Sequence, residues 1–193
     1  FKKKSNRGSF NVPQNVIVEN DLLIIPKFKD GIKMSLHRPT KGIIKSATIS
    51  VTPTGKYFVS ILCDTKEEIP TKAPITESTT IGIDLGIKDF AITSEGEVFE
   101  NPKYLRKAQS KLKYIQRKYS KYKGKRTKKK LAKLHEDVVN KRKDFLHKVS
   151  TKLIRENQTI CLETLAVKNM VKNHNLAQAI SDVSWSTFVS MLE

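Results

Sequence analysis

Cysteine is scarce in this sequence of 193 residues, which contains only two, Cys63 and Cys161. The two lie far apart, and neither has a second cysteine or a nearby histidine at the spacing of a metal site. This pattern excludes a disulfide framework and argues against a zinc site in the chain. Because both cysteines lie in apolar, strand-like segments, the sequence is typical of a protein in a reducing cytoplasm.

Long apolar runs and acidic residues are scarce as well. No run approaches the roughly 20 residues that a membrane-spanning helix needs, and no signal-peptide pattern is visible, so we expect no membrane partner. The sequence has 19 Asp and Glu against 37 Lys and Arg, which gives a formal net charge of +18. Such an excess of positive charge favours a polyanionic partner, most often a nucleic acid.

The first part of the chain has the pattern of a small β domain. Short apolar or alternating runs between Gly, Pro and Asn turns predict five strands, at 15–18, 22–25, 31–36, 45–51 and 57–63. This favours a small β-barrel or sandwich over residues 1–75. A polar stretch with two prolines at 64–79 reads as a linker. A second domain is expected over residues 76–193, so the chain belongs to a mixed class, α+β or α/β.

An apolar run at 80–91 carries one carboxylate, Asp84, at its centre. Asp84 would be costly to bury as an unpaired charge, so we expect it to bind a cation, form an ion pair or end a strand at a turn. Gly82 and Gly86 flank it and open the backbone to close approach by a bulky group such as a phosphate. The alternative is a turn bounded by glycines with an exposed Asp, and this run alone does not choose between the two.

Residues 102–156 predict a basic helical hairpin. Between 103 and 155 the chain has 21 Lys and Arg but only three acidic residues. Apolar residues at steps of three and four indicate two amphipathic helices, separated by a short basic turn around Gly124. The expected seam consists of Leu105, Ala108, Leu112, Ile115, Tyr119 and Tyr122 in the first helix, and Leu131, Leu134, Val138, Phe145, Val149 and Leu153 in the second.

The remaining faces of the hairpin are almost wholly basic. Like charges crowded on one helix face cost stability, so we expect a polyanion to lie against them. A soluble, self-repelling coiled coil is the alternative, and the few acidic residues disfavour it. The residues that we expect to bind nucleic acid are Lys107, Lys111, Arg117, Lys118, Lys121, Lys125, Arg126, Lys128, Lys129 and Lys130 in the hairpin, with Lys168 and Asn169 in a later polar loop.

A second short apolar strand, at 159–165, carries Glu163. The long helical segment between the two strands is a crossover of the length that a parallel β–α–β pairing requires. If the strands are parallel neighbours, Asp84 and Glu163 come side by side, and they repel each other unless cations lie between them. Mg²⁺ or Mn²⁺ ions about 3.5–4 Å apart are the arrangement of two-metal nucleases.

The end of the chain predicts a helix from about 176 and another around Trp185. Good capping residues precede this tryptophan at 181–184. Trp185, Phe188, Val189 and Leu192 share one helical face. We therefore expect Trp185 to pack in the core, with base stacking as the minor alternative.

Three motifs together resemble a known family. They are the segments 82–88 (GIDLGIK), 160–170 (ICLETLAVKNM) and 180–185 (ISDVSW). In this order and at this separation they resemble the TnpB family, the OrfB-type transposases of small prokaryotic insertion sequences and relatives of type V CRISPR effector nucleases. The resemblance covers nearly the whole chain, and the segment around 55–60 resembles the end of the family's β-barrel (wedge) domain.

The resemblance implies a wedge-like barrel followed by a RuvC-like domain of the RNase H type, with the basic hairpin inserted in it. Such a protein is an RNA-guided, metal-dependent DNA endonuclease involved in transposition, and its partners are a guide RNA and a DNA target. Asp84 matches the family's first catalytic carboxylate and Glu163 the second, and both would be ligands of Mg²⁺ or Mn²⁺. A prokaryotic, cytoplasmic protein associated with the nucleoid is implied.

The sequence also departs from the family pattern. The family's zinc-binding cysteine pairs and its third catalytic Asp lie beyond the Trp motif, and no carboxylate in this sequence matches that third position. Asp182 matches a different family position and reads as a helix cap. Both ends look cut, because the chain opens on Phe1 and stops within a helical pattern. We therefore expect these residues alone to bind metal poorly and to cleave little or nothing.

Two other functions fit the charge. The first is a catalytically inactive nucleic-acid-binding remnant of such an element. The second is a basic protein associated with ribosomes, which accounts for the charge but not for the two strands with carboxylates. Salt-sensitive binding of RNA and DNA is expected of both the nuclease and the binding remnant, so binding alone does not separate these two.

Overall fold

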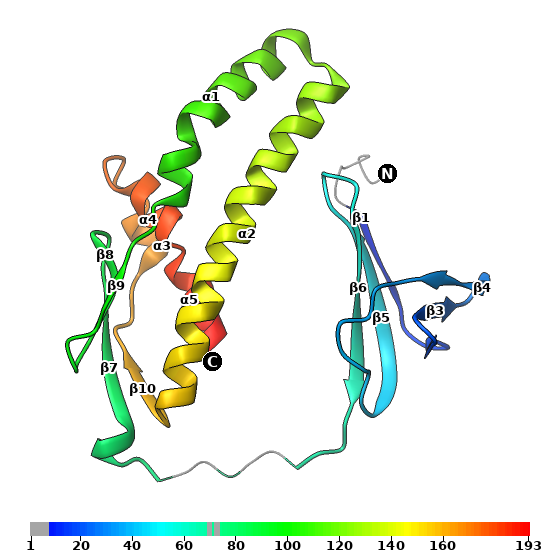
Figure 1. The fold of residues 1–193 in the computed structure, drawn as a ribbon, viewed down its shortest axis with the longest axis horizontal. Helices are drawn as coiled ribbons and strands as arrows, with labels where there is room; N and C mark the ends of the chain where they lie inside the picture. The colour runs from blue at the N-terminus through cyan, green and yellow to red at the C-terminus, as the bar shows by residue number, and fades with distance from the viewer. Residues whose placement is uncertain (1–7, 69–70, 72–73) are drawn as a thin grey trace. The chain divides into compact units, whose positions relative to one another are not determined.

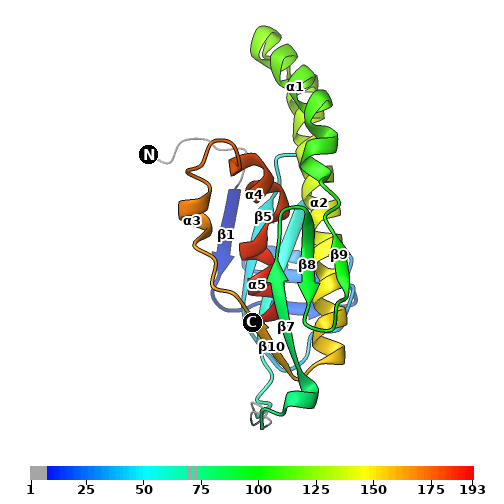
Figure 2. The ribbon, with the colours of Figure 1, turned by 90° about the vertical axis from the view of Figure 1, so that its left-hand side faces the viewer.

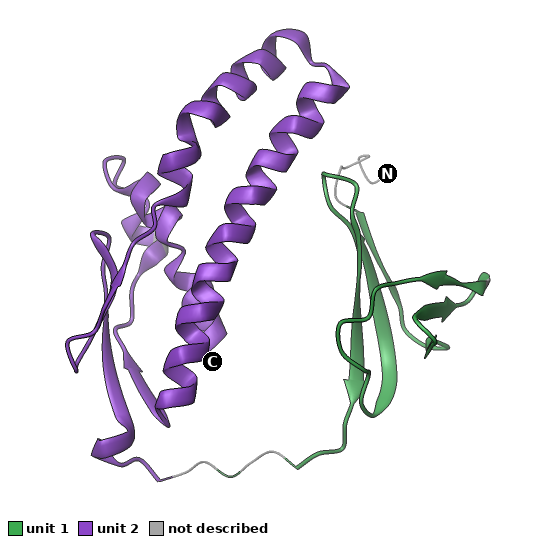
Figure 3. Cartoon of the chain, in the orientation of Figure 1, with its two compact units in different colours: residues 1–71 green, residues 72–193 purple. Residues whose placement is uncertain are grey.

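The computed structural model describes residues 8–68, 71 and 74–193. The chain divides into two compact units, residues 1–71 and 72–193 (Figure 3). The basic opening of the sequence and part of the expected linker lie outside the described residues.

Two antiparallel sheets of three strands build the first unit (Figure 1). One sheet has the order β1-β5-β6 and the other the order β2-β3-β4. Their bounds are Gly8–Val12 for β1, Ile43–Val51 for β5, Tyr57–Asp64 for β6, Ile17–Glu19 for β2, Leu22–Ile25 for β3 and Phe28–Lys33 for β4. The sequence pattern missed β1 and placed β4 about three residues too late.

The small core of this unit consists of Val16, Leu23, Ile25 and Ala47. The expectation of a closed barrel is wrong for the described residues, because no strand of one sheet pairs with a strand of the other. Closure requires strands of matched tilt and stagger around a ring. Here β2 and β3 have only three and four residues, whereas β5 has nine, so the two sheets remain open.

The second unit is built on a sheet of four strands in the order β10-β7-β8-β9. The strands are β7 (Thr80–Leu85), β8 (Asp89–Thr93), β9 (Val98–Glu100) and β10 (Thr159–Leu162), and a short 3₁₀ turn, η1 (Glu77–Thr79), precedes them. The β7-β8 and β8-β9 pairs are antiparallel, whereas β10 runs parallel to β7. The expected parallel crossover is therefore present, and β7, β8 and β9 form an antiparallel meander.

A long helical hairpin makes this crossover. Helix α1 (Tyr104–Tyr122) and helix α2 (Lys125–Glu156) are joined at Lys123, which adopts a left-handed conformation with φ 46°. Leu112 and Ile115 of α1 are buried with Val138 of α2, which confirms the expected seam. Figures 1 and 2 both show the hairpin extending beyond the sheet. At its far end Tyr122 is 64% exposed, so its assignment to the seam is wrong.

The second half of α2 packs on the sheet together with the three short helices α3 (Val167–Met170), α4 (Ala177–Val183) and α5 (Trp185–Leu192). Phe90 of β8 lies at the centre of this core. Its ring contacts Phe145 edge-on with centroids 5.0 Å apart, and Phe188 with centroids 4.9 Å apart. Trp185 is only 2% exposed, which confirms the core assignment. Among the described residues, no helix combines the length and the apolar character needed to cross a membrane.

One ion pair ties α2 to the turn between β8 and β9. The Lys152 ammonium donates a hydrogen bond to the Glu97 carboxylate and lies 5.5 Å from the centre of the Phe99 ring. The hydrogen bond to Glu97 raises the pKa of Lys152 above its ordinary value of 10.5. A raised lysine pKa adds stability below pH 10.5, and this stability is lost as the pH rises through the folded-state pKa.

We therefore expect Lys152→Met to lower the midpoint of urea unfolding slightly at pH 8 and to flatten the loss of stability above pH 10.5. Urea titrations at pH 8 and at a series of pH values above 10.5 measure the effect. Lys141→Met is the matched control, since Lys141 pairs with Asp137 on the exposed side of the same helix. Equal pH profiles for the parent and Lys152→Met would contradict the expectation.

Candidate functional site

Asp84 lies on the exposed face of the sheet in the second unit. Side chains alternate between the two faces along a strand. Ile81, Ile83 and Leu85 are buried on the face that packs against the helices, so Asp84 points to the other side and is exposed. Asp84 lies within β7 and not in the turn that follows.

Glu163 is brought next to this position by the parallel strand. Four residue pairs fix the register of β10 against β7, and the last joins Leu162 to Ile83. Asp84 follows Ile83 within β7, and Glu163 follows Leu162 directly after β10, which ends three residues earlier than expected; both residues are exposed. They line one surface pocket, together with Gly82, Ile83, Ile92, Thr93, Ser94, Cys161 and Leu162. The expected juxtaposition of the two carboxylates is thus what the strand register produces.

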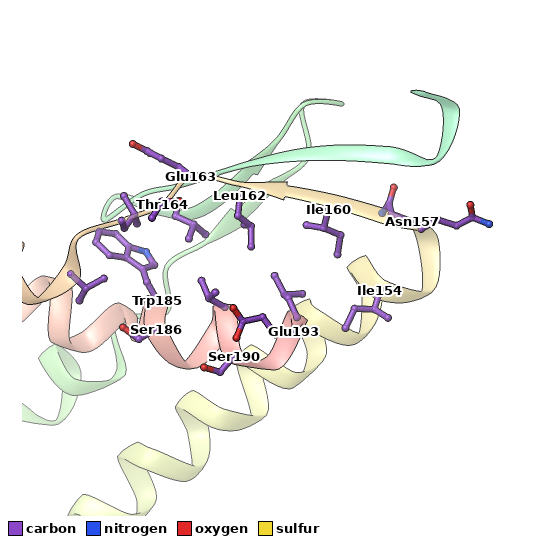
Figure 4. Close-up of a pocket in the computed structure, with 16 residues that line it drawn as sticks. Ile154, Asn157, Ile160, Leu162, Glu163, Thr164, Trp185, Ser186, Ser190 and Glu193 are labelled. Carbon is purple, nitrogen blue, oxygen red and sulfur yellow. The ribbon is translucent and has the colours of Figure 1, made fainter. Parts of the chain in front are cut away.

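The opposite face of β10 belongs to a different pocket, between this strand and α5. Figure 4 shows Ile160 and Leu162 pointing from the strand toward α5, whereas Glu163 points away from the helix. Trp185 also lines this second pocket, and Glu163, just beyond the end of the strand, borders both pockets. Alternation along β10 therefore separates an apolar side, which faces the helices, from a carboxylate side, which faces solvent.

The two glycines beside Asp84 have different roles. A Cβ on Gly86 would lie 2.7 Å from the carbonyl oxygen of Asp89, so this glycine is required by the tight turn between β7 and β8. The expectation that Gly86 leaves room for a phosphate is wrong, because the backbone of the turn fills that space. Gly82 donates its N–H to the Ser94 Oγ at 3.1 Å and lines the carboxylate pocket.

Asp182 lies outside the carboxylate pocket and interacts with the start of α1. Its side chain is 6% exposed, and its carboxylate accepts hydrogen bonds from the backbone N–H groups of Leu105 at 2.9 Å and Arg106 at 3.1 Å. Arg142 of α2 adds an ion pair at 3.4 Å. Asp182 therefore caps the start of α1, where Lys103 provides no side-chain cap. It does not line the pocket of Asp84 and Glu163, and no local sequence pattern indicated that it would cap a distant helix.

The expected nucleic-acid-binding residues lie along the hairpin, outside the carboxylate pocket. All ten of the hairpin residues named above are exposed, and α1 contains no acidic residue. Asn169 is exposed on α3, whereas the side chain of Lys168 lies outside the part of the chain that the structure describes. The hairpin and the two carboxylates are thus separate features of one unit.

Within the described residues, no group of three or more His, Cys, Asp and Glu side chains could hold a metal ion. Cys63 and Cys161 are both free thiols. Cys161 is exposed on the carboxylate side of β10 and was not expected there. Its position two residues before Glu163 was the signal that could have placed it.

Comparison with known proteins gives a consistent result. The model of the OrfB_IS605 family, described as "Probable transposase", matches residues 60–174. A putative RNA-guided DNA endonuclease of Streptomyces pristinaespiralis is 38% identical over 199 residues, which cover 99% of this chain and 48% of that protein. The putative RNA-guided DNA endonuclease InsQ of Escherichia coli K12 is 33% identical over 181 residues, covering 90% and 44%. The chain spans about half the length of these curated relatives.

Proposed function

Because this chain belongs to the OrfB_IS605 family of probable transposases, the TnpB-type proteins, we propose that it is part of an RNA-guided DNA endonuclease of a transposable element. Both relatives are named as such enzymes. Residues 76–193 would form a RuvC-like nuclease domain and residues 1–75 a wedge-like domain that binds nucleic acid. The sheet order β10-β7-β8-β9, with only the β10-β7 pair parallel, supports an RNase H-type arrangement.

The observation that carries the proposal is the register of β10 on β7. It makes Asp84 and Glu163 neighbours on an exposed face, and neither carboxylate pairs with a cationic side chain among the described residues. Two adjacent, unpaired carboxylates repel each other and are relieved by a cation. Mg²⁺ is bound in many phosphoryl-transfer sites through one or two carboxylates, with waters and substrate phosphates as its other ligands. The pair therefore fits Mg²⁺ or Mn²⁺.

In this proposal Asp84 and Glu163 hold the divalent ion at the edge where β7 and β10 end. When bound, the ion supplies positive charge that stabilises the transition state of phosphodiester hydrolysis. The lysines and arginines of the hairpin neutralise phosphates and position the backbone, while base pairing with the guide RNA reads the sequence. We propose that the third carboxylate of the family pattern lies outside these 193 residues, so that this chain alone is a weak metal site.

Metal binding tests the site directly. We expect the parent chain to bind Mn²⁺, and to bind it more tightly when a nucleic acid supplies phosphate ligands. The paramagnetic signal of the free ion measures this binding. Asp84→Asn and Glu163→Gln should each weaken this binding at least about tenfold, the lower end of the loss found when metal-supporting groups are removed.

Glu100→Gln is the matched control, because Glu100 is an exposed carboxylate on β9, away from the carboxylate pocket. It should leave Mn²⁺ binding unchanged. If both site variants bind Mn²⁺ as the parent does, the carboxylate pair is not the metal site. If nucleic acid binds in a salt-dependent way but Mn²⁺ binding never depends on it, the inactive binding remnant is the better function.

A further inference from the structure

One face of α1 combines lysines with exposed tyrosines. Five of its residues follow one another at steps of three and four, and the sixth, Tyr122, lies four residues after Lys118. All six are exposed and are called here the tyrosine–lysine face: Lys107, Lys111, Tyr114, Lys118, Lys121 and Tyr122. We propose that this face binds an unpaired segment of nucleic acid, with Tyr114 and Tyr122 stacking on its bases. The inference rests on the proposed function and specifies the form of nucleic acid that the hairpin holds.

The exposure of the two rings is the first observation. Tyr114 and Tyr122 are each 64% exposed, whereas Tyr104 and Tyr119 of the same helix are half-buried. Leu112 and Ile115 make the buried apolar contacts of the helix. Tyr114 lies on a different face from Leu112, and Tyr122, the last residue of the helix, is exposed although it continues the spacing of the seam. The two exposed rings therefore add little to the packing of the hairpin and are free to contact a ligand.

The charge around the rings is the second observation. The helix has seven Lys and Arg and no acidic residue. The Lys121 ammonium lies 5.3 Å from the centre of the Tyr122 ring, so a cation and an aromatic surface are presented together. Alternating cationic groups and flat rings are the features of single-strand binding grooves, in which the cations follow the phosphates and the rings stack on successive bases.

The two tyrosine rings also favour unpaired strands over paired ones. Lysines alone neutralise phosphates of a duplex and of a single strand alike. The bases of a duplex are already stacked on one another, so an exposed tyrosine gains little from them. An unpaired base offers its π-face, and stacking on an aromatic side chain then adds affinity that the duplex does not receive.

The test compares two labelled oligonucleotides of equal length, one unpaired oligouridine and one mixed-sequence duplex, in the presence of EDTA. Fluorescence anisotropy measures the affinity of the 193-residue chain for each. We expect the double variant Tyr114→Ala, Tyr122→Ala to bind the unpaired strand about five- to a hundredfold more weakly, and to bind the duplex with less than about a twofold change. Alanine favours helix at these exposed positions, so the hairpin remains folded, and circular dichroism checks this.

Two controls separate stacking from charge. Tyr114→Phe with Tyr122→Phe keeps both rings and should bind as the parent does. Lys118→Gln should weaken binding of both oligonucleotides. It should also reduce the slope of the logarithm of affinity against the logarithm of salt concentration, by the amount expected for about one phosphate contact. Photocrosslinking with 5-iodouridine in the unpaired strand should label Tyr114 and Tyr122 in preference to Tyr119.

The inference is overturned if the double alanine variant keeps its affinity for the unpaired strand, or if it loses both oligonucleotides equally. Binding of an acidic protein at this face, with no crosslink to uridine, would also overturn it. Because the assay contains no metal, these outcomes leave the carboxylate site untouched. A parent chain that binds neither oligonucleotide would instead count against the proposed function as a whole.

Discussion

Replacing Phe188 with alanine should lower the free energy of unfolding of the second unit by about 3–5 kcal/mol, the range for truncating a buried phenylalanine. Phe188 is fully buried, and its ring meets Phe90 edge-on, so the substitution removes aromatic contact as well as apolar area. Domains of this size have only about 5–15 kcal/mol of stability. The change therefore removes a large part of what holds α5 against the sheet.

Urea unfolding followed by tryptophan fluorescence measures the effect. Trp185 is the only tryptophan in the chain and lies in the same core as Phe188, so its emission reports the second unit alone. Val139→Ala is the control, because Val139 is 44% exposed on α2 and its truncation should change the stability by less than about 0.5 kcal/mol. A loss below about 1 kcal/mol for Phe188→Ala would contradict this expectation and show that neighbouring side chains move to fill the cavity left by the ring.

Asp182→Ala should cost about 3 kcal/mol of stability through a different mechanism. The substitution leaves the backbone N–H groups of Leu105 and Arg106 without their acceptor, and loss of such a cap costs about 0.5–2 kcal/mol. It also leaves the largely buried Arg142 without its carboxylate. Removing one partner of a buried ion pair is strongly destabilising, because the remaining charge is buried and uncompensated. The negative charge of Asp182 also interacts favourably with the partial positive charge at the N-terminus of α1.

Hydrogen exchange locates this loss. We expect the amides of Leu105 and Arg106 to exchange at least about tenfold faster in Asp182→Ala, because their protection now depends on a frayed first turn. Asp144→Ala is the control, since Asp144 forms a solvent-exposed pair with Lys148 one turn along α2, and such pairs contribute little to stability. Unchanged protection of the two amides in Asp182→Ala would mean that the carboxylate does not hold the start of the helix.

Sequence patterns predicted the features that depend on local periodicity. The hairpin follows from apolar residues at helical spacing, and the neighbouring carboxylates follow from two short apolar strands joined by a crossover long enough for parallel pairing. Alternation along β7 and β10 then places Asp84 and Glu163 on one face without further information.

The features that were missed depend on distant partners. Whether the short strands of the first unit close into a barrel depends on tilt and stagger, which no residue pattern encodes locally. The cap of α1 by Asp182 joins residues that are far apart in the chain. Tyr122 continues the helical spacing of the seam, yet it is the last residue of α1, beside the turn, and its side chain is exposed.

The parallel pairing of β10 with β7 also fixes an order of assembly during synthesis. The ribosome releases β7, β8 and β9 before the hairpin, so Asp84 is presented on its sheet while Glu163 has not yet been made. A hairpin is rich in local contacts, which form fast, and once folded it shortens the loop that must close to bring β10 to β7. The two carboxylates therefore meet only after the basic helices have been synthesised, and a nascent chain that carries only the first of them has half of the proposed metal site.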